Sequence, residues 1–163
     1  MTKNALMVID VQNYFVNDNT QILPKKIAEF IENNKFDFVL FTKFVNKKDS
    51  NFFGILNWKK CISSPDTDIH SALVKFVDKN NVFEKSTYSI FKSEKLAEFL
   101  ENNKITKLFL CGIDIDGCVL ASLYDGFDLG YDIKVLKDLS LSHYGKEMDN
   151  SALKIIEKNS INI

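Results

Sequence analysis

Apolar residues occur along this chain in short runs, each about as long as one strand of a sheet. The segments expected as strands are residues 5–9, 36–42, 81–84, 106–111 and 131–136, of which 81–84 is short and has a polar residue at each end. The first of them is apolar at every position, which is typical of a strand that is covered on both faces. The pattern therefore predicts five strands in the interior of the fold.

Between these runs, apolar residues recur at the spacing of one helix face. In the segment that Pro24 opens, Ile27 and Ile31 lie on the same side of a helix. Three further helices are expected at 94–100, 118–130 and 151–158. Because parallel strands need crossover connections, this alternation of strand and helix predicts a parallel sheet with helices on both faces.

The order of the strands determines where a ligand would bind. Open α/β sheets place their crevice at the carboxyl ends of the strands, where the strand order reverses. Asp10 directly follows the first expected strand, and Cys118 follows the fourth. In the common doubly wound order these two strands are neighbours, so we expect residues more than a hundred positions apart to meet in one crevice.

Composition narrows the class of protein. The 163 residues fit a single domain, 1–163, and 21 basic against 22 acidic residues give a net charge of −1. No basic stripe is present, so neither nucleic acid nor an anionic membrane is expected as a partner, and a small molecule is. Three cysteines without a CxxC pair, together with the lack of a signal peptide or membrane-length apolar segment, predict a soluble cytoplasmic protein with reduced thiols.

Three residues could carry covalent chemistry. Cys118 stands where an apolar strand breaks and restarts as a helix, whose free N–H groups would favour a thiolate and then hold an oxyanion. Asp10 could remove and return the thiol proton, and Lys85 could keep that carboxylate ionised. Each residue also has an ordinary interpretation. Asp10 could be a turn residue at the end of a strand, Lys85 a surface charge, and Cys118 a small core residue.

The motifs around these residues resemble those of the isochorismatase-like cysteine hydrolases. The resemblance spans nearly the whole chain, through the segments 6–15, 83–91 and 112–130. It implies a three-layer α/β/α, Rossmann-like sheet of five or six parallel strands, and an expected homo-oligomer. In this resemblance Asp10, Lys85 and Cys118 match the catalytic residues. It also implies a cis peptide between Ile113 and Asp114, and an oxyanion site formed by the N–H groups of Gly117 and Cys118.

Departures from the family pattern narrow the expected activity. Nicotinamidases of the family bind a metal through histidines near the end of the second strand, but residues 42–46 contain none. Neither a metal nor another cofactor is therefore expected, and nicotinamide is not the expected substrate. Because Cys118 is kept, hydrolysis of an amide or carbamoyl C–N bond through a thioester is favoured. A vinyl-ether hydrolase and a non-catalytic binding module remain alternatives.

The irregular segment 43–68 is rich in aromatic residues and is long enough to be functional. Phe15, Phe53, Trp58 and Tyr88 are expected to wall a substrate pocket, although aromatic residues are more often part of the core. The other residues that could take part in chemistry are expected to have structural roles only. Asp116 is expected to cap a helix, His70 to lie at a helix start and His143 on a surface loop, and Cys61 and Cys111 to be buried as small apolar residues.

Overall fold

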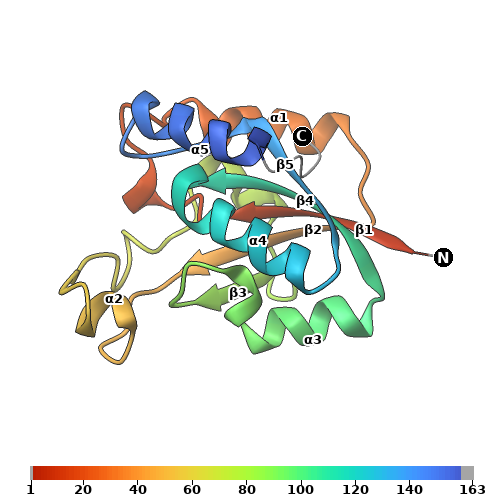
Figure 1. Cartoon of the computed structure of the whole chain (residues 1–163), viewed down its shortest axis with the longest axis horizontal. Helices are drawn as coiled ribbons and strands as arrows, with labels where there is room; N and C mark the ends of the chain where they lie inside the picture. The colour runs from red at the N-terminus through yellow and green to blue at the C-terminus, as the bar shows by residue number, and fades with distance from the viewer. Residues whose placement is uncertain (1, 159–163) are drawn as a thin grey trace.

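A computed structural model describes residues 2–158 of the chain and shows five parallel strands in one sheet (Figure 1). The strands are β1 (Lys3–Ile9), β2 (Phe38–Phe44), β3 (Val82–Lys85), β4 (Ile105–Ile113) and β5 (Asp132–Leu141). Their order across the sheet is β3-β2-β1-β4-β5. All five predicted strands are confirmed, with ends that differ by a few residues.

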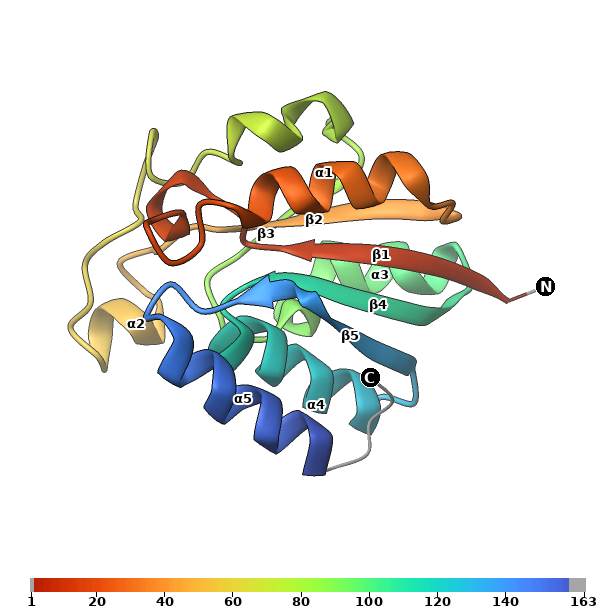
Figure 2. The ribbon, with the colours of Figure 1, turned by 90° about the horizontal axis from the view of Figure 1, so that it is seen from above.

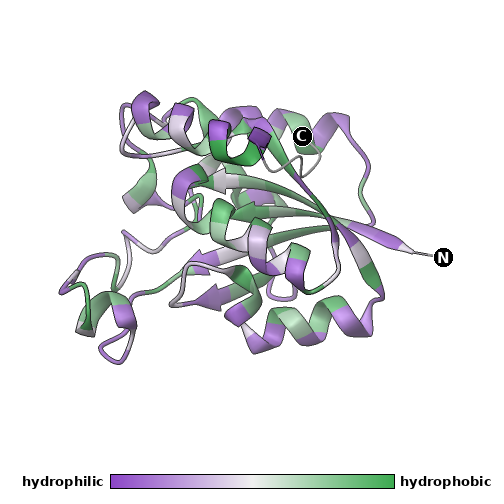
Figure 3. Ribbon diagram, viewed as in Figure 1, coloured by the Kyte–Doolittle hydropathy of each residue, from purple (hydrophilic) through white to green (hydrophobic). Residues whose placement is uncertain are grey.

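Helices cover both faces of this sheet (Figure 2). Helix α1 (Leu23–Asn33) and a 3-10 segment (Ser71–Phe76) lie on one face, and the other carries α3 (Glu94–Asn102), α4 (Leu120–Asp128) and α5 (Lys146–Lys158). Alternate residues of β1 enter opposite cores, because successive side chains of a strand point to opposite faces. Figure 3 shows the result, with hydrophobic strands between helices whose outer sides are hydrophilic. The three-layer α/β/α prediction is confirmed.

Two helices depart from the expected pattern. Helix α5 begins at Lys146, five positions before the predicted start at Ser151. Its first turn carries Lys146, Glu147 and Asp149 and follows Gly145, which has a φ of 103°, so the apolar pattern did not reveal it. The irregular segment contains a short helix, α2 (Asn51–Gly54), whose N-cap is Ser50. In the described part of the chain, no helix is both long and apolar enough to cross a bilayer.

The strand order reverses between β1 and β4, as predicted. These two strands pair in parallel, with Val8 opposite Cys111 and Ile9 opposite Gly112. Gly112 has a φ of 127°, and a Cβ atom there would meet the carbonyl oxygen of Ile9 at 2.1 Å. Only glycine therefore allows this close approach, which brings the segment after β4 beside the end of β1.

Candidate active site

Asp10 directly follows β1 and is completely buried. Its φ of 51° is a left-handed conformation, which aspartate tolerates better than most residues. The hydroxyl of Thr42, on β2, donates to Oδ1 at 2.7 Å, and the ammonium of Lys85 donates to Oδ2 at 2.5 Å. Both carboxylate oxygens thus have a fixed donor, and the neighbouring strand end supplies one of them.

Lys85 is the last residue of β3 and is 5% exposed. Besides Asp10, its Nζ donates to the carbonyl oxygen of Thr87 at 2.8 Å and to Sγ of Cys118 at 3.4 Å, which accounts for all three ammonium protons. Burial acts to lower the pKa of Lys85, but its interactions with Asp10 and Cys118, which include a hydrogen bond to each, outweigh this effect and raise the pKa. The side chain is therefore a buried cation that touches both other candidate groups.

Cys118 lies inside a single π-helical turn, Ile115–Val119, which precedes α4. The carbonyl oxygen of Asp114 accepts hydrogen bonds from the N–H groups of both Gly117 (3.1 Å) and Val119 (3.0 Å). The expectation that Cys118 heads an ordinary helix is therefore wrong in detail, because the turn is wider than an α-helical turn. Such π-turns occur frequently at functional sites.

The electrostatics of the site favour a neutral thiol at rest. Burial is the largest effect and raises the pKa of Cys118; the Lys85 ammonium lowers it, and Asp10 raises it through its charge and a hydrogen bond. Burial and the neighbouring carboxylate thus keep the proton on the sulfur at rest. The arrangement is suited to transfer this proton to Asp10 when the sulfur attacks an electrophile.

The backbone around the turn requires one correction. The Ile113–Asp114 peptide is cis, as the resemblance implies. However, the N–H of Gly117 already donates to the Asp114 carbonyl oxygen, so Gly117 does not offer the free oxyanion donor that was expected. The Cys118 N–H remains the proposed donor.

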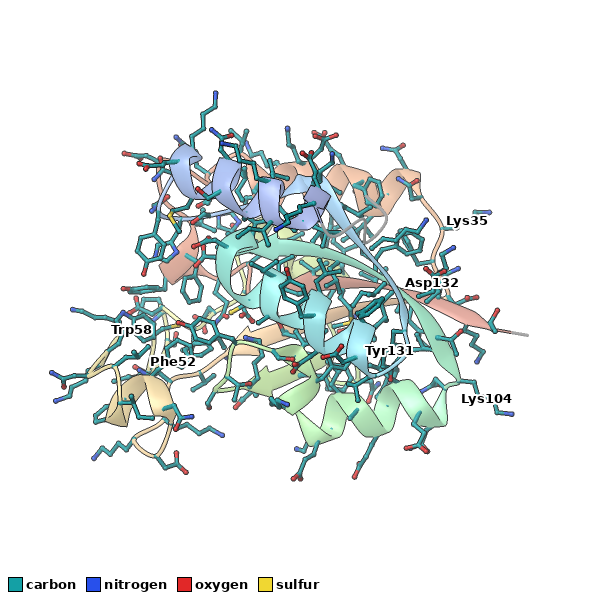
Figure 4. All side chains as sticks on the ribbon, viewed as in Figure 1. Lys35, Phe52, Trp58, Lys104, Tyr131 and Asp132 are labelled. Atoms are coloured by element: carbon teal, nitrogen blue, oxygen red, sulfur yellow. The ribbon has the colours of Figure 1, made fainter. Side chains whose placement is uncertain are left out.

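A cavity of about 570 Å³ opens beside Cys118. Of the four expected pocket residues, Phe15, Trp58 and Tyr88 contribute to its wall. Figure 4 shows Trp58 and Phe52 close together at the end of the molecule opposite Lys35 and Lys104. The lining residues are Phe15, Phe44, Phe52, Leu56, Trp58, Tyr88, Asp114, Asp116, Gly117, Cys118, Leu120, Ala121, Tyr124, His143 and Tyr144.

Phe53 does not line this cavity, so that expectation is wrong, and its neighbour Phe52 lines it instead. Consecutive residues of a helix point in directions about 100° apart, so only one of the two rings can face inward. Phe52 packs against Tyr88, with ring centroids 4.6 Å apart, and against Trp58 at 5.9 Å. The ring of Phe53 instead lies beneath the ammonium of Lys59.

Two residues with other expected roles also reach the cavity. His143 is not on the surface: its side chain is 15% exposed, and its Nδ1 lies 2.7 Å from Oδ2 of Asp114. Asp116 lines the cavity and makes no capping hydrogen bond. The position of His143, two residues after the true end of β5, is the signal that could have revealed it, by the same rule that identified Asp10.

Gln12 was also missed as a positioning residue. Its side-chain N–H groups donate to the carbonyl oxygens of Phe44 (2.9 Å) and Thr67 (2.8 Å), and its oxygen accepts from the Phe44 N–H at 2.7 Å. The buried Gln12 thus fastens both ends of the aromatic segment to the end of β1. Its place two residues after Asp10, in an Asp-x-Gln motif, was the available signal.

The structural expectations for His70, Cys61 and Cys111 are confirmed. His70 is the N-cap of the 3-10 segment, where its Nδ1 accepts from the Ala72 N–H. Cys61 and Cys111 are buried free thiols, the latter within β4.

The donor atoms near β2 do not suit a divalent metal. Residues 42–46 contain no histidine or carboxylate, and the described residues include no group of three or more His, Cys, Asp or Glu side chains that could hold an ion. No step of the chemistry proposed below uses a metal.

The fold and this site place the chain in a known class of enzymes. A family model described as the Isochorismatase domain matches residues 4–161, and the chain belongs to this isochorismatase-like hydrolase family. Isochorismatase family protein 2A of Dictyostelium discoideum is 29% identical over 165 residues, which cover 96% of this chain and 75% of that protein.

Solved structures agree with this assignment. An isochorismatase-like hydrolase from Alkaliphilus metalliredigens has the same fold, with a TM-score of 0.81 and 21% identity over 96% of this chain and 92% of that chain. Nicotinamidase PncA from Bacillus subtilis has a TM-score of 0.76 and 27% identity over 98% and 97% of the two chains.

Proposed function

We propose that this protein hydrolyses a C–N bond of a small amide or carbamoyl compound through a thioester on Cys118. The observation that carries the proposal is the position of the Lys85 ammonium, 2.5 Å from Asp10 and 3.4 Å from the Cys118 sulfur, beside an aromatic-walled cavity. The nicotinamidase among the similar structures supports amide chemistry for the family. The missing histidines at 42–46 argue for a substrate other than nicotinamide.

In the first half of the reaction, Asp10 takes the proton of the Cys118 thiol as the sulfur bonds to the carbonyl carbon. The carbonyl π electrons move to oxygen, where the Cys118 N–H donates to the developing oxyanion. Lys85 stays protonated and stabilises the charge near the sulfur. Asp10 then passes its proton to the substrate nitrogen, the C–N bond breaks, and ammonia or an amine leaves.

The second half regenerates the thiol. Asp10 takes a proton from a water molecule, whose oxygen bonds to the thioester carbon. The C–S bond breaks, the acid departs, and the proton on Asp10 returns to sulfur. The sum of the steps is amide plus water giving acid plus ammonia, with no change in the protein.

A screen of small amides, carbamates and ureas for ammonia release tests this proposal. The wild-type protein should release ammonia from at least one of them, and Cys118→Ala should lower the rate by about 10³-fold or more. Cys111→Ala is the matched control, because that thiol is buried in β4 away from the cavity, and it should retain the activity.

The same variants distinguish the alternatives. Cys118→Ala protein that still hydrolyses a vinyl ether would support ether hydrolysis without a thioester. No release of ammonia from any compound, together with a Cys118 that iodoacetamide does not modify even at alkaline pH, would support a binding module. Either outcome would overturn the proposed reaction.

A further inference from the structure

The charged groups around the cavity are unbalanced. Asp114, Asp116 and His143 line it, and none of its lining residues in the described part of the chain is Lys or Arg. Lys85 lies behind Cys118 and uses its donors on Asp10, Thr87 and the sulfur. Two carboxylates against one imidazole leave an excess of negative charge whether or not His143 is protonated.

The two carboxylates differ in how they are bonded. Oδ1 of Asp114 accepts the backbone N–H of His143 at 2.7 Å, and both Asp114 oxygens lie within 2.8 Å of the His143 ring. Asp116 has no comparable partner, and its Oδ1 is buried without a hydrogen bond from any described residue. A buried carboxylate oxygen without a donor is destabilising, and because Asp116 also lines the cavity, a positive charge beside it would offset part of this cost.

The rest of the wall suits a cation. Seven of the lining side chains are aromatic, and the negative faces of aromatic rings attract positive charge. Burial raises the pKa of Tyr144, and the charges of Asp114 and Asp116 raise it further. The pKa of Tyr88 is raised by burial, by Cys118 and by the same two carboxylates. Both phenols therefore lie within the electrostatic field of the acidic pair.

We propose that the substrate is an amide whose non-reacting part carries a protonated amine, and that Asp116 determines this specificity by accepting its N–H. The inference rests on the proposed function, since it takes the cavity beside Cys118 as the substrate site. A substrate with a carboxylate on that part would meet uncompensated negative charge and would be excluded. Cationic amides are thus the class to test first.

Binding can be measured without catalysis, because Trp58 is the single tryptophan of the chain and lines the cavity. Three probes share one ring and differ in the head group: benzylammonium, benzyl alcohol and benzoate. Quenching of Trp58 fluorescence at neutral pH should give a Kd for benzylammonium about tenfold lower than that for benzyl alcohol, with benzoate weakest. The series on the wild-type protein needs no variant.

Two aspartate variants then test whether Asp116 causes the preference for benzylammonium. Asp116→Asn keeps the size of the side chain but removes its charge, and should reduce the preference to about twofold or less. Asp128→Asn, an exposed position at the end of α4, is the matched control and should keep the full preference. Circular dichroism of both variants checks that the fold is kept.

Three results would overturn the inference: benzyl alcohol or benzoate binding as tightly as benzylammonium, an unchanged preference in Asp116→Asn, or no response of Trp58 to benzylammonium. The preference should persist in Cys118→Ala protein, because recognition does not need the sulfur. If ammonia release fails but the preference holds, the proposed reaction is wrong and the specificity stands. If ammonia is released but benzylammonium is not preferred, the proposed reaction stands and the proposed specificity is wrong.

Discussion

The two walls of the cavity are built in different ways. The proposed catalytic wall presents Cys118 to the cavity, with Asp10 and Lys85 behind it, and hydrogen bonds from the Lys85 ammonium join the three side chains. The aromatic wall takes Phe44, Phe52 and Trp58 from the irregular segment 43–68, where Phe52 and Trp58 pack ring against ring. One wall is fixed by buried charges on the sheet and the other by apolar contacts on a loop, so substrate specificity could change without altering the chemistry.

Amide side chains attach the aromatic wall to the catalytic one. Besides Gln12, the buried Asn46 donates to the carbonyl oxygens of Trp58 (2.7 Å) and Lys60 (3.1 Å) and accepts from the Ser50 hydroxyl at 2.6 Å. Phe44 belongs to both walls, because it lines the cavity and lies 5.2 Å beneath the Lys85 ammonium. The loop is therefore held at a few points, whereas each catalytic group is held at every polar atom.

The largest expected effect comes from breaking the buried ion pair of the catalytic wall. Lys85→Met should lower the free energy of unfolding by about 3–5 kcal/mol, because it leaves the Asp10 carboxylate buried without its counter-ion. Urea denaturation followed by circular dichroism measures this loss. The double variant Asp10→Asn/Lys85→Met should recover a large part of it, since neither charge remains.

A double variant no more stable than Lys85→Met would mean that the cost lies in lost packing rather than in the unpaired charge. The catalytic wall would then be stabilised mainly by packing, as the aromatic wall is, and the proposed contrast between the two walls would be wrong.

A smaller effect is expected from the aromatic wall, and the adjacent phenylalanines of α2 provide a matched pair. Phe52→Ala should raise KM by about tenfold with kcat nearly unchanged, since it removes a ring of the cavity wall that takes no part in the bond changes. Phe53→Ala should change KM by about twofold or less, because that ring does not face the cavity. Steady-state kinetics on the best amide of the screen measures both. Equal effects of the two variants would contradict the assignment of Phe52 to the wall.

The contrast between the two walls also explains which features of the site could be predicted from the sequence. The sheet and the meeting of Asp10 with Cys118 were predictable, because apolar runs define buried strands and the carboxyl end of a parallel strand places its next residues at one edge. Asp10 and Cys118 therefore met as expected. Lys85 was only a candidate cation for this pair, and the family resemblance supported all three positions. Phe52 could not be distinguished from Phe53, because the direction of each ring depends on a four-residue helix that the apolar pattern does not show.

His143 was missed for a related reason. The apolar pattern ended the last strand at residue 136, whereas β5 continues to Leu141 past the polar residues Lys137 and Asp138. The occupied N–H of Gly117 depends on the π-turn, whose hydrogen bonds converge on the Asp114 carbonyl oxygen. Local backbone geometry of this kind is set by tertiary contacts that no local pattern of residue types encodes.

The central claim is that Asp10, Lys85 and Cys118 act as one electrostatically coupled unit. Its most direct measurement is the pH dependence of Cys118 modification by iodoacetamide, read by peptide mass spectrometry under native conditions. Cys61 and Cys111 serve as internal controls, because both are buried. Since Asp10 raises the pKa of Cys118 and Lys85 lowers it, Asp10→Asn should shift the modification curve to lower pH and Lys85→Met to higher pH. Curves that coincide with that of the wild-type protein in both variants would contradict the account.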